Sequence, residues 1–285
     1  MELTSDMARA VSTAWAVAVH TPEPLYGGDE SSAFRIGAHV VRVGAPWRST
    51  ADIAWCGEVA SAAAEEVPEA VAPVPTTDGR TVIRVSGRPV TVWPFVAGEW
   101  GDPEDDDQCR RVAHLLARVH RTLSRTKTPP RPRRDVPAAP VPELADAELD
   151  AWLAAFRRGR PRRPVHGDVY HANVLARTGR VVALLDWDEA TLDAPEWDVS
   201  GAAFEWSDTP DTLDISAAMD FVHRYTVAGG PATQLDEVTI RQLIRARIRR
   251  ETAYDRAVNP TPDAEDVDYQ RRRLAAFHAL RPDTR

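Results

Sequence analysis

The amino-acid sequence predicts an α+β protein of two lobes, in which a β-rich N-terminal lobe with an antiparallel sheet precedes a helical C-terminal lobe. Short β-rich segments separated by Gly-containing turns are concentrated in residues 25–95. Apolar residues at helical spacing dominate residues 106–280. The composition changes between these regions, at residues 96–105 (VAGEWGDPED). We therefore expect one lobe of residues 1–96 and a second of residues 97–285.

The first lobe is expected to open with a helix and to continue as two hairpins on either side of a second helix. Gly37-Ala38 and Ser86-Gly87 supply the hairpin turns. The helix between them is Ala-rich and ends before Pro68, because proline cannot continue a helix. The predicted elements are helix 8–19, strands 33–37 and 39–43, helix 50–66, and strands 80–86 and 88–93.

The second lobe is predicted to be mostly helical. Apolar residues from Val112 to Leu123 fall on one helical face, since they recur with a period of about 3.6 residues. The prolines of residues 129–142 indicate a semi-rigid linker or a surface excursion. The predicted elements are helices 106–124, 143–158, 212–228, 235–258 and 264–280, with a β-type segment at 163–186.

The bulk composition indicates a folded, globular protein, since 43% of the 285 residues are hydrophobic and nine are tryptophan. The N-terminus does not resemble a signal peptide, and no apolar run approaches the roughly 18 residues of a membrane span. Cys56 and Cys109 lack metal-type spacing and are interpreted as reduced thiols. The net charge of −8 disfavours non-specific nucleic-acid binding. We expect a cytoplasmic protein without nucleic-acid or membrane partners, and the oligomeric state stays open.

Arginine replaces lysine almost completely in this chain. Lys127 is the one lysine among its 35 Lys and Arg residues. A P-loop is excluded, because its Gly-Lys-Ser/Thr step is missing. A Schiff-base enzyme would have to use Lys127, which lies in the proline-rich segment. A GC-rich genome explains the bias, yet any phosphate that this protein binds must still be bound by arginine.

The segment 164–200 carries the clearest chemical pattern. Asp168 follows His166-Gly167, Asn173 lies five residues later, and Asp186 lies thirteen residues beyond Asn173. The sequences NVLA and VVALL between them predict a hairpin that brings the three polar residues together. An Asn carbonyl and an Asp carboxylate suit Mg²⁺, and a separate carboxylate can orient an attacking hydroxyl. The pattern favours metal-assisted phosphoryl transfer.

The order HGDxxxxN, LLDWD and PxxWDVS resembles the aminoglycoside phosphotransferase and choline kinase family of small-molecule kinases, which has a protein-kinase-like fold. The resemblance covers most of the chain and implies a nucleotide-binding first lobe and a catalytic, substrate-binding second lobe. It implies that Asp168 is the catalytic base and that Asn173 and Asp186 bind Mg²⁺. It also implies ATP or GTP as phosphoryl donor. Asp198 would anchor the catalytic loop.

The same resemblance assigns nucleotide-binding roles in the first lobe. Residues 25–32, with Gly28 and Ser31, resemble the phosphate-covering loop, although they lack the GxGxxG pattern. Arg42 stands where kinases place a lysine, and Glu58 on the next helix is its expected partner; either could instead be an ordinary solvent-facing residue. The hinge would comprise Trp93, Phe95 and Val96, and the residues flanking the base would be Val41, Val74 and Leu175.

The acceptor pocket is assigned to the C-terminal helices. Acids and aromatics there suit a cationic acceptor, through charge pairing and cation–π contact. The candidate residues are Glu205, Trp206, Asp208, Glu251, Tyr254 and Asp255, with Asp188 either close to the metal or exposed. We expect an antibiotic or its precursor as acceptor. A choline-, homoserine- or sugar-type metabolic kinase and a catalytically silent nucleotide-binding module are the alternatives.

Several residues also have simpler interpretations. His166 is expected to be structural, bonded to nearby backbone. His166, Asp168 and His171 form an HxDxxH pattern that zinc could use, but the later Asn and Asp explain the segment better. Trp197 is open to either a core or a substrate role. The RARIRR sequence at 245–250 could bind nucleic acid, although a solvated or salt-bridged helix face is the better interpretation in an acidic chain.

Overall fold

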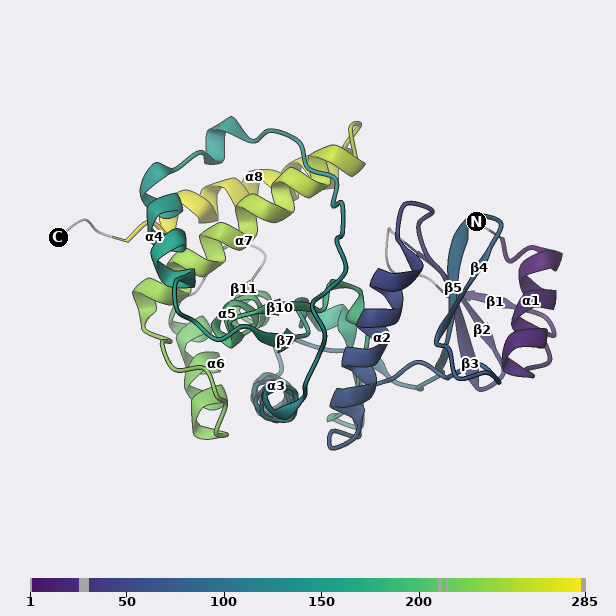
Figure 1. Ribbon diagram of the computed structural model, residues 1–285. Coiled ribbons are helices and arrows are strands. Elements are labelled where there is room, and N and C mark those ends of the chain that lie inside the picture. The colour runs from purple at the N-terminus through teal and green to yellow at the C-terminus, as the bar shows by residue number, and fades with distance from the viewer. Residues whose placement is uncertain (1, 26–30, 210–211, 214, 283–285) are drawn as a thin grey trace.

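The computed structural model describes residues 2–25, 31–209, 212–213 and 215–282, with the side chains of 208, 209, 212 and 213 excepted. Figure 1 shows a sheet-containing lobe at one end of the molecule and a larger helical lobe at the other. This arrangement confirms the predicted α+β fold class with an antiparallel N-terminal sheet.

The first lobe is built on a five-stranded antiparallel sheet in the order β1-β2-β3-β5-β4. Helix α1 (Ser5–Trp15) covers one face of it, and Met7, Val11 and Trp15 pack there against the strands. Thr4 caps this helix by accepting the N–H of Met7, so α1 begins earlier than expected. The strands are β1 (Glu23–Leu25), β2 (Ser32–Ile36), β3 (His39–Val43), β4 (Val82–Val85) and β5 (Arg88–Pro94).

Helix α2 (Thr50–Ala64) connects the two lobes. Ser49 caps its N-terminus by accepting the N–H of Asp52. Its buried side chains, which include Trp55 and Val59, belong to the large hydrophobic core of the second lobe and not to the smaller core under the sheet. Packing against the second lobe therefore fixes the position of a helix that precedes β4 and β5 in the sequence.

The second lobe is mostly helical. Its helices are α3 (Asp106–Arg125), α4 (Ala147–Arg157), α5 (Pro195–Glu205), α6 (Ile215–Val227), α7 (Glu237–Val258) and α8 (Ala264–Ala279). Its strands are β6 (Glu99–Trp100), β7 (Arg163–Val165), β8 (Val174–Arg177), β9 (Arg180–Leu184), β10 (Thr191–Asp193), β11 (Asp208–Thr209) and β12 (Thr212–Leu213). They form the small sheets β6-β8-β9, β7-β10 and β11-β12. No helix in the described ranges is long and apolar enough to cross a membrane.

Residues 126–141, here called the strap, have no regular secondary structure and run from α3 past α2 and α7 to α4 (Figure 1). The indole of Trp55 on α2 donates to the carbonyl of Pro129 at 2.9 Å. The N–H of Ala139 donates to the carbonyl of Ala253 on α7 at 2.8 Å. The proline-rich segment is thus bound to helices of both lobes.

Candidate active site

Residues 166–173 between β7 and β8, here called the catalytic loop after the role expected for them, are held by α5. Asp198 is fully buried, and its two carboxylate oxygens accept the backbone N–H groups of His166 and Gly167, each at 2.9 Å. The ring of His120 on α3 lies 3.0 Å from the same carboxylate. These contacts are the ones that a loop anchor must make, and they fix the backbone immediately before Asp168.

His166 joins the catalytic loop to the loop that carries Asp186. Its Nε2 lies 2.8 Å from the carbonyl of Leu185, and its Nδ1 lies 3.2 Å from the N–H of Asp168. These partners assign a neutral ring with the proton on Nε2, and burial also lowers the pKa of His166. Both ring nitrogens are occupied, so His166 is not available for zinc. The described residues contain no cluster of three His, Cys, Asp or Glu side chains suited to a metal ion.

Gly167 is required by the close approach of these two loops. It has φ +86°, and a Cβ added there would lie 2.3 Å from the carbonyl oxygen of Glu189. A side chain at this position would separate the catalytic loop from the segment after Asp186.

Asp168 and Asn173 face each other across one turn. The Nδ2 of Asn173 donates to the backbone carbonyl of Asp168 at 3.0 Å and to its Oδ2 at 2.8 Å. The carbonyl of Asn173 accepts the N–H of Leu185 at 2.7 Å, which places Asn173 next to Asp186 at the start of the β8–β9 hairpin. Since the amide nitrogen is engaged, the amide oxygen is the atom of Asn173 that remains to bind a cation.

Asp186 adopts a left-handed backbone conformation, with φ 54° and ψ 74°. Such a conformation in a non-glycine residue costs on the order of 1–3 kcal/mol and is concentrated at functional sites. Its carboxylate accepts hydrogen bonds from both terminal guanidinium nitrogens of Arg42, each at 3.1 Å. Burial alone would raise the pKa of Asp186, but the charge and hydrogen bonds of Arg42 outweigh it and lower the pKa, so the group is ionised.

Arg42 on β3 is a central cation of the site, although its predicted partner is wrong. Its guanidinium contacts Ser31 at 3.1 Å and Asp188 at 3.2 Å in addition to Asp186. Glu58 is exposed, and among the described contacts none joins it to Arg42. Helical geometry explains the error: α2 turns the face with Asp52 toward the site, and Glu58 lies on the opposite face.

Asp188 does not line the acceptor cavity, which corrects the substrate-binding role expected for it. Its carboxylate lies 3.2 Å from the guanidinium of the buried Arg48 and also pairs with Arg42. The side chain is about four-fifths buried, with 22% of its surface exposed. Asp188 therefore belongs to the charge network around Asp186.

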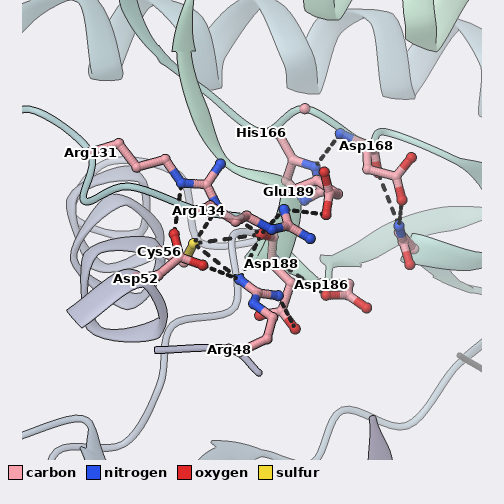
Figure 2. Close-up of polar contacts among 12 residues, drawn as sticks. Arg48, Asp52, Cys56, Arg131, Arg134, His166, Asp168, Asp186, Asp188 and Glu189 are labelled. Atoms are coloured by element: carbon pink, nitrogen blue, oxygen red, sulfur yellow. Dashed lines mark hydrogen bonds and ion pairs between the residues drawn. The ribbon is translucent and has the colours of Figure 1, made fainter. Parts of the chain in front are cut away.

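This network extends to the strap, as Figure 2 shows. The carbonyl of Asp188 accepts from Arg48 at 3.1 Å and from the strap residues Arg131 and Arg134 at 3.3 Å each. Asp52 on α2 binds Arg48 and Arg131, both at 2.9 Å. No local sequence pattern marks these three arginines as a group, because the carbonyl of Asp188 that they share lies 54 to 140 residues away from them.

The expected hinge residues lie between the two lobes. Trp93 is buried and donates its indole N–H to Thr91 at 2.8 Å, so its side chain serves the core. Phe95 donates its backbone N–H to Ala38 at 2.8 Å and lies under the guanidinium of Arg35 at 4.0 Å. Val96 packs against the large core.

Two of the residues expected to flank the base face the small core of the first lobe and not the second lobe. Val41 is buried in the small core under the sheet, and Val74 packs against that same core. Val40, one residue earlier, packs instead against the large core. Alternation along β3 thus turns Val40 and Arg42, not Val41, toward the second lobe. Leu175 lies on β8 in the large core, and Gly28 lies outside the described residues.

A buried arginine that the sequence analysis did not assign lies beside Asp168. Arg247 on α7 donates to the Oδ1 of Asp168 at 2.7 Å and to the carbonyl of Gly167 at 3.1 Å. Its Nε lies 2.5 Å from Glu251. Gly201 on α5 makes room for it, since a Cβ there would lie 2.2 Å from the guanidinium. Arg245, Arg247 and Arg249 of RARIRR form ion pairs, as the salt-bridged interpretation expects, but Arg245 and Arg247 are buried and do not form a solvated face.

The environment of Asp168 shifts the pKa of its carboxyl group toward neutral pH. Burial raises the pKa of Asp168 to about 7, and the charge of Arg247 opposes this rise. Arg247 itself keeps its charge: burial would lower its pKa, but Glu251 and Asp168 outweigh burial and raise it. A carboxylate poised in this way suits proton transfer near neutral pH.

A cavity of about 1010 Å³ opens beside Asp168. Glu205 and Trp206, two of the expected acceptor residues, line it together with Tyr254, Glu251 and Asp255. The indole N–H of Trp206 donates to the carbonyl of Val169 at 3.0 Å and so also braces the catalytic loop. The side chain of Asp208 is not among those described. Seven acids line the cavity, and their surplus is reduced by five arginines on the same walls, namely Arg134, Arg247, Arg250, Arg272 and Arg273.

The donor set fits a magnesium ion bound together with a phosphate. Mg²⁺ in nucleotide sites uses one or two protein oxygen ligands and completes its shell with phosphates and water. The amide oxygen of Asn173 and the ionised carboxylate of Asp186 would supply such ligands, since a backbone hydrogen bond joins Asn173 to Leu185, the residue before Asp186. Arg42, next to Asp186, supplies a cation for phosphate oxygens.

Comparison with known proteins places the chain in a family of phosphotransferases. The model of the phosphotransferase enzyme family matches residues 21–235. A curated homoserine kinase from Beijerinckia indica subsp. indica is 29% identical over 170 residues, covering 54% of this chain and 53% of that protein. The chain thus spans about half the length of the curated relatives it matches.

Two solved structures resemble the whole chain. The microcompartment-associated aminopropanol kinase superimposes with a TM-score of 0.75 and 18% identity, covering 96% of this chain and 95% of that one. An amicoumacin kinase in complex with AMP-PNP and Ca²⁺ gives a TM-score of 0.74 and 15% identity, covering 96% and 92%. At these identities the likeness shows the fold, and it confirms the predicted fold class.

Proposed function

The chain belongs to the phosphotransferase enzyme family, and from this premise we propose that it transfers the terminal phosphoryl group of ATP or GTP to a hydroxyl of a small molecule, with Mg²⁺ as cofactor. The main supporting observation is the convergence of Asp168, Asn173 and Asp186, from the loop before β8 and the end of β9, beside a large cavity. The complete polar set also favours an active enzyme over a catalytically silent nucleotide-binding module.

Asp168 is proposed to orient the acceptor hydroxyl and to take its proton as the oxygen–phosphorus bond forms. Asn173 and Arg247 each hold one of its carboxylate oxygens, so the group is fixed before the acceptor arrives. Each oxygen retains a further lone pair with which to accept the hydroxyl proton. The bond between the transferred phosphorus and the nucleoside diphosphate breaks, and the diphosphate leaves.

The remaining polar residues are proposed to bind the donor nucleotide. Asn173 and Asp186 would hold Mg²⁺, which neutralises charge on the nucleotide phosphates when bound. Arg42 and Ser31 would contact phosphate oxygens, and the hinge around Phe95 and Val96 would meet the base. Catalysis would then rest on positioning and charge stabilisation.

The acceptor is proposed to be a small alcohol that carries an amino group. One curated relative is named as a homoserine kinase and one structural neighbour as an aminopropanol kinase, and both of those compounds carry an amino group and a hydroxyl. The cavity is large enough for a small metabolite or for a larger antibiotic. A resistance or self-protection role predicts an antibiotic acceptor, and a metabolic role predicts a small metabolite. The identity of the accepted alcohol therefore tests this part of the proposal.

Replacing Asp168 with Asn tests the proposed reaction. We expect D168N to lower turnover of Mg-ATP in the presence of accepted alcohols by about 10²- to 10⁴-fold, the usual contribution of a general base. The dissociation constant for the nucleotide, measured by calorimetry, should stay within about twofold, because Asp168 is not among the proposed nucleotide contacts.

The matched control is D78N, which makes the same change at an exposed carboxylate of the first lobe that pairs with Arg80. It should leave both quantities unchanged. Near-normal turnover by D168N, or turnover that persists without divalent cations, would refute the assignment of the reaction to this site.

A further inference from the structure

Arginines compensate part of the negative charge on the walls of the acceptor cavity. Four of the seven acids on its walls lie within ion-pair distance of a guanidinium. The pairs are Asp168 with Arg247 at 2.7 Å, Glu251 with Arg247 at 2.5 Å, Glu189 with Arg134 at 2.5 Å, and Glu205 with Arg273 at 3.1 Å. These walls therefore present less negative charge to an acceptor than the sequence suggests.

Arg250 is a wall residue without such compensation. It lies on α7, three residues after Arg247, and lines the cavity. Its guanidinium lies 5.1 Å from the centre of the Trp197 ring, a cation–π distance that keeps the planar group against the wall. Within the described part of the chain, no carboxylate forms an ion pair with Arg250.

The electrostatic environment of Arg250 differs from that of its neighbour. The Arg250 side chain is exposed toward the cavity, and partial desolvation by the surrounding wall, together with the positive charge of Arg247, lowers its pKa. Glu251 and Glu189 oppose the shift without cancelling it. The carboxylates beside Arg247, in contrast, raise the pKa of that residue. A negative group placed at Arg250 would therefore be stabilised.

We propose that Arg250 binds a carboxylate of the acceptor, so that the substrate class is a hydroxy acid, an amino acid with a side-chain hydroxyl included. This inference rests on the proposed phosphotransfer and names its substrate. A guanidinium matches a carboxylate with two parallel hydrogen bonds, which makes arginine selective for this group. A wholly cationic acceptor would leave Arg250 uncompensated and would be repelled by it.

The spacing between Asp168, where the hydroxyl would react, and Arg250, where the carboxylate would bind, suits a short acceptor. Side chains three residues apart on a helix are separated by about 5–6 Å at Cβ. Arg247 contacts Asp168, where the hydroxyl must react, and Arg250 lies one helical turn further along the same wall. An acceptor that reaches both carries its hydroxyl and its carboxylate about three to four carbons apart, and larger groups can extend into the rest of the cavity.

Matched pairs of acceptors isolate the carboxylate. L-homoserine and 3-aminopropan-1-ol differ only in the carboxylate, as do L-threonine and 1-aminopropan-2-ol. We expect kcat/KM, measured as ADP release from Mg-ATP by the full chain, to favour the carboxylate-bearing member of at least one pair by about 10- to 100-fold. This is the range expected for a hydrogen bond to a charged group.

The variant R250Q should abolish this preference by lowering kcat/KM for the carboxylate-bearing acceptor, and it should leave KM for ATP unchanged. R250K should restore part of the preference, since lysine keeps the charge but not the fork. The control is R249Q, which removes the same charge from the same turn of α7. Arg249 pairs with Asp150 at 2.6 Å and does not line the cavity, so the preference should persist.

Two results would overturn the proposal. One is equal or better turnover of the amines that lack the carboxylate, which the wild-type protein alone can reveal without any variant. The other is no turnover of either carboxylate-bearing acceptor while slow, Asp168-dependent ATP hydrolysis persists; this would reject the hydroxy acid and leave the phosphotransfer standing. Loss of that hydrolysis as well would reject the proposed function.

Discussion

Arg42 shows why arginine can replace lysine at the centre of a phosphotransfer site. Its guanidinium reaches Ser31, Asp186 and Asp188 at once, with distances of 3.1–3.2 Å. A lysine ammonium is a compact point charge and lacks the planar fork that makes these simultaneous contacts. The arginine bias of the chain thus has a structural use at this position, whatever its origin in the genome.

Arg42 should be needed for binding the donor nucleotide. We expect R42A to raise KM for ATP about tenfold or more, because a hydrogen bond between charged groups is lost for each phosphate oxygen that Arg42 would contact. Steady-state kinetics at saturating acceptor would measure this change.

Two replacements serve as controls for R42A. Lys127 is exposed on the strap, and Glu58 is exposed on the far face of α2, so K127A and E58Q should leave KM for ATP within about twofold of the wild-type value. An unchanged KM in R42A would show that another arginine binds the phosphates. A raised KM in E58Q would indicate that Glu58 is, after all, the partner of Arg42.

The residues of the site differ in how far the sequence reveals them. Asp168, Asn173 and Asp186 lie within one segment at fixed spacings, so a local pattern identifies them. Arg247 reaches Asp168 across 79 residues, and Arg48 reaches Asp188 across 140. Such contacts depend on how α7 and α2 pack, and a single sequence carries no signal for them.

At the scale of elements, one buried carboxylate organises the helices behind the cavity. Asp146 caps α4 by accepting the N–H of Leu149 at 3.0 Å. The same carboxylate binds the buried Arg245 on α7, and it binds Arg281 after α8 at 2.6 Å. Burial alone would raise the pKa of Asp146, but these donors outweigh it and lower the pKa.

The lowered pKa of Asp146 makes its contribution to stability dependent on pH. Because the folded-state pKa lies below the unfolded value of about 3.9, the stabilisation is complete above about pH 5 and is lost as the pH falls below about 4. D146N should lower the free energy of unfolding at pH 7 by about 3 kcal/mol, since it leaves a buried arginine unpaired. Urea unfolding across this pH range would measure the difference.

The control for D146N is D150N on the same helix. Asp150 is 61% exposed and pairs with Arg249 at the surface, so its replacement should cost less than about 1 kcal/mol. The difference between D146N and the wild type should narrow as the pH falls from 5 toward 3. A difference that stays constant over this range would contradict the role given to the ionised carboxylate.

Elements were predictable where a local signal marks them. Their turn residues predict the hairpins β2–β3 and β4–β5, and its apolar face predicts α3. Helix α5 was not predicted, because ten of its eleven residues are buried and no polar face gives it a period. The prediction that Val41 flanks the base was also wrong, since neighbouring residues of a strand point to opposite faces of the sheet.

At the scale of the whole molecule, α2 and the strap bind the two lobes around the charge network. The buried face of α2 belongs to the large core, and Asp52 at its start binds arginines from the β3–α2 connection and from the strap. The strap then continues along α7, where Val136, Pro137 and Ala138 line the acceptor cavity. The sequence predicted two lobes, but the role of a proline-rich segment in joining them depends on contacts distant in sequence.

The most direct test of the proposed chemistry is the identity of the bond that is formed. The wild-type protein would be incubated with Mg-ATP and each acceptor, and the product would be examined by ³¹P NMR with correlation to the acceptor protons. We predict a phosphate monoester at the hydroxyl oxygen, formed by the wild type and not by D168N. No phosphorylated acceptor in any reaction, or phosphorus attached to the acceptor nitrogen, would contradict an O-phosphotransferase that uses Asp168 as its base.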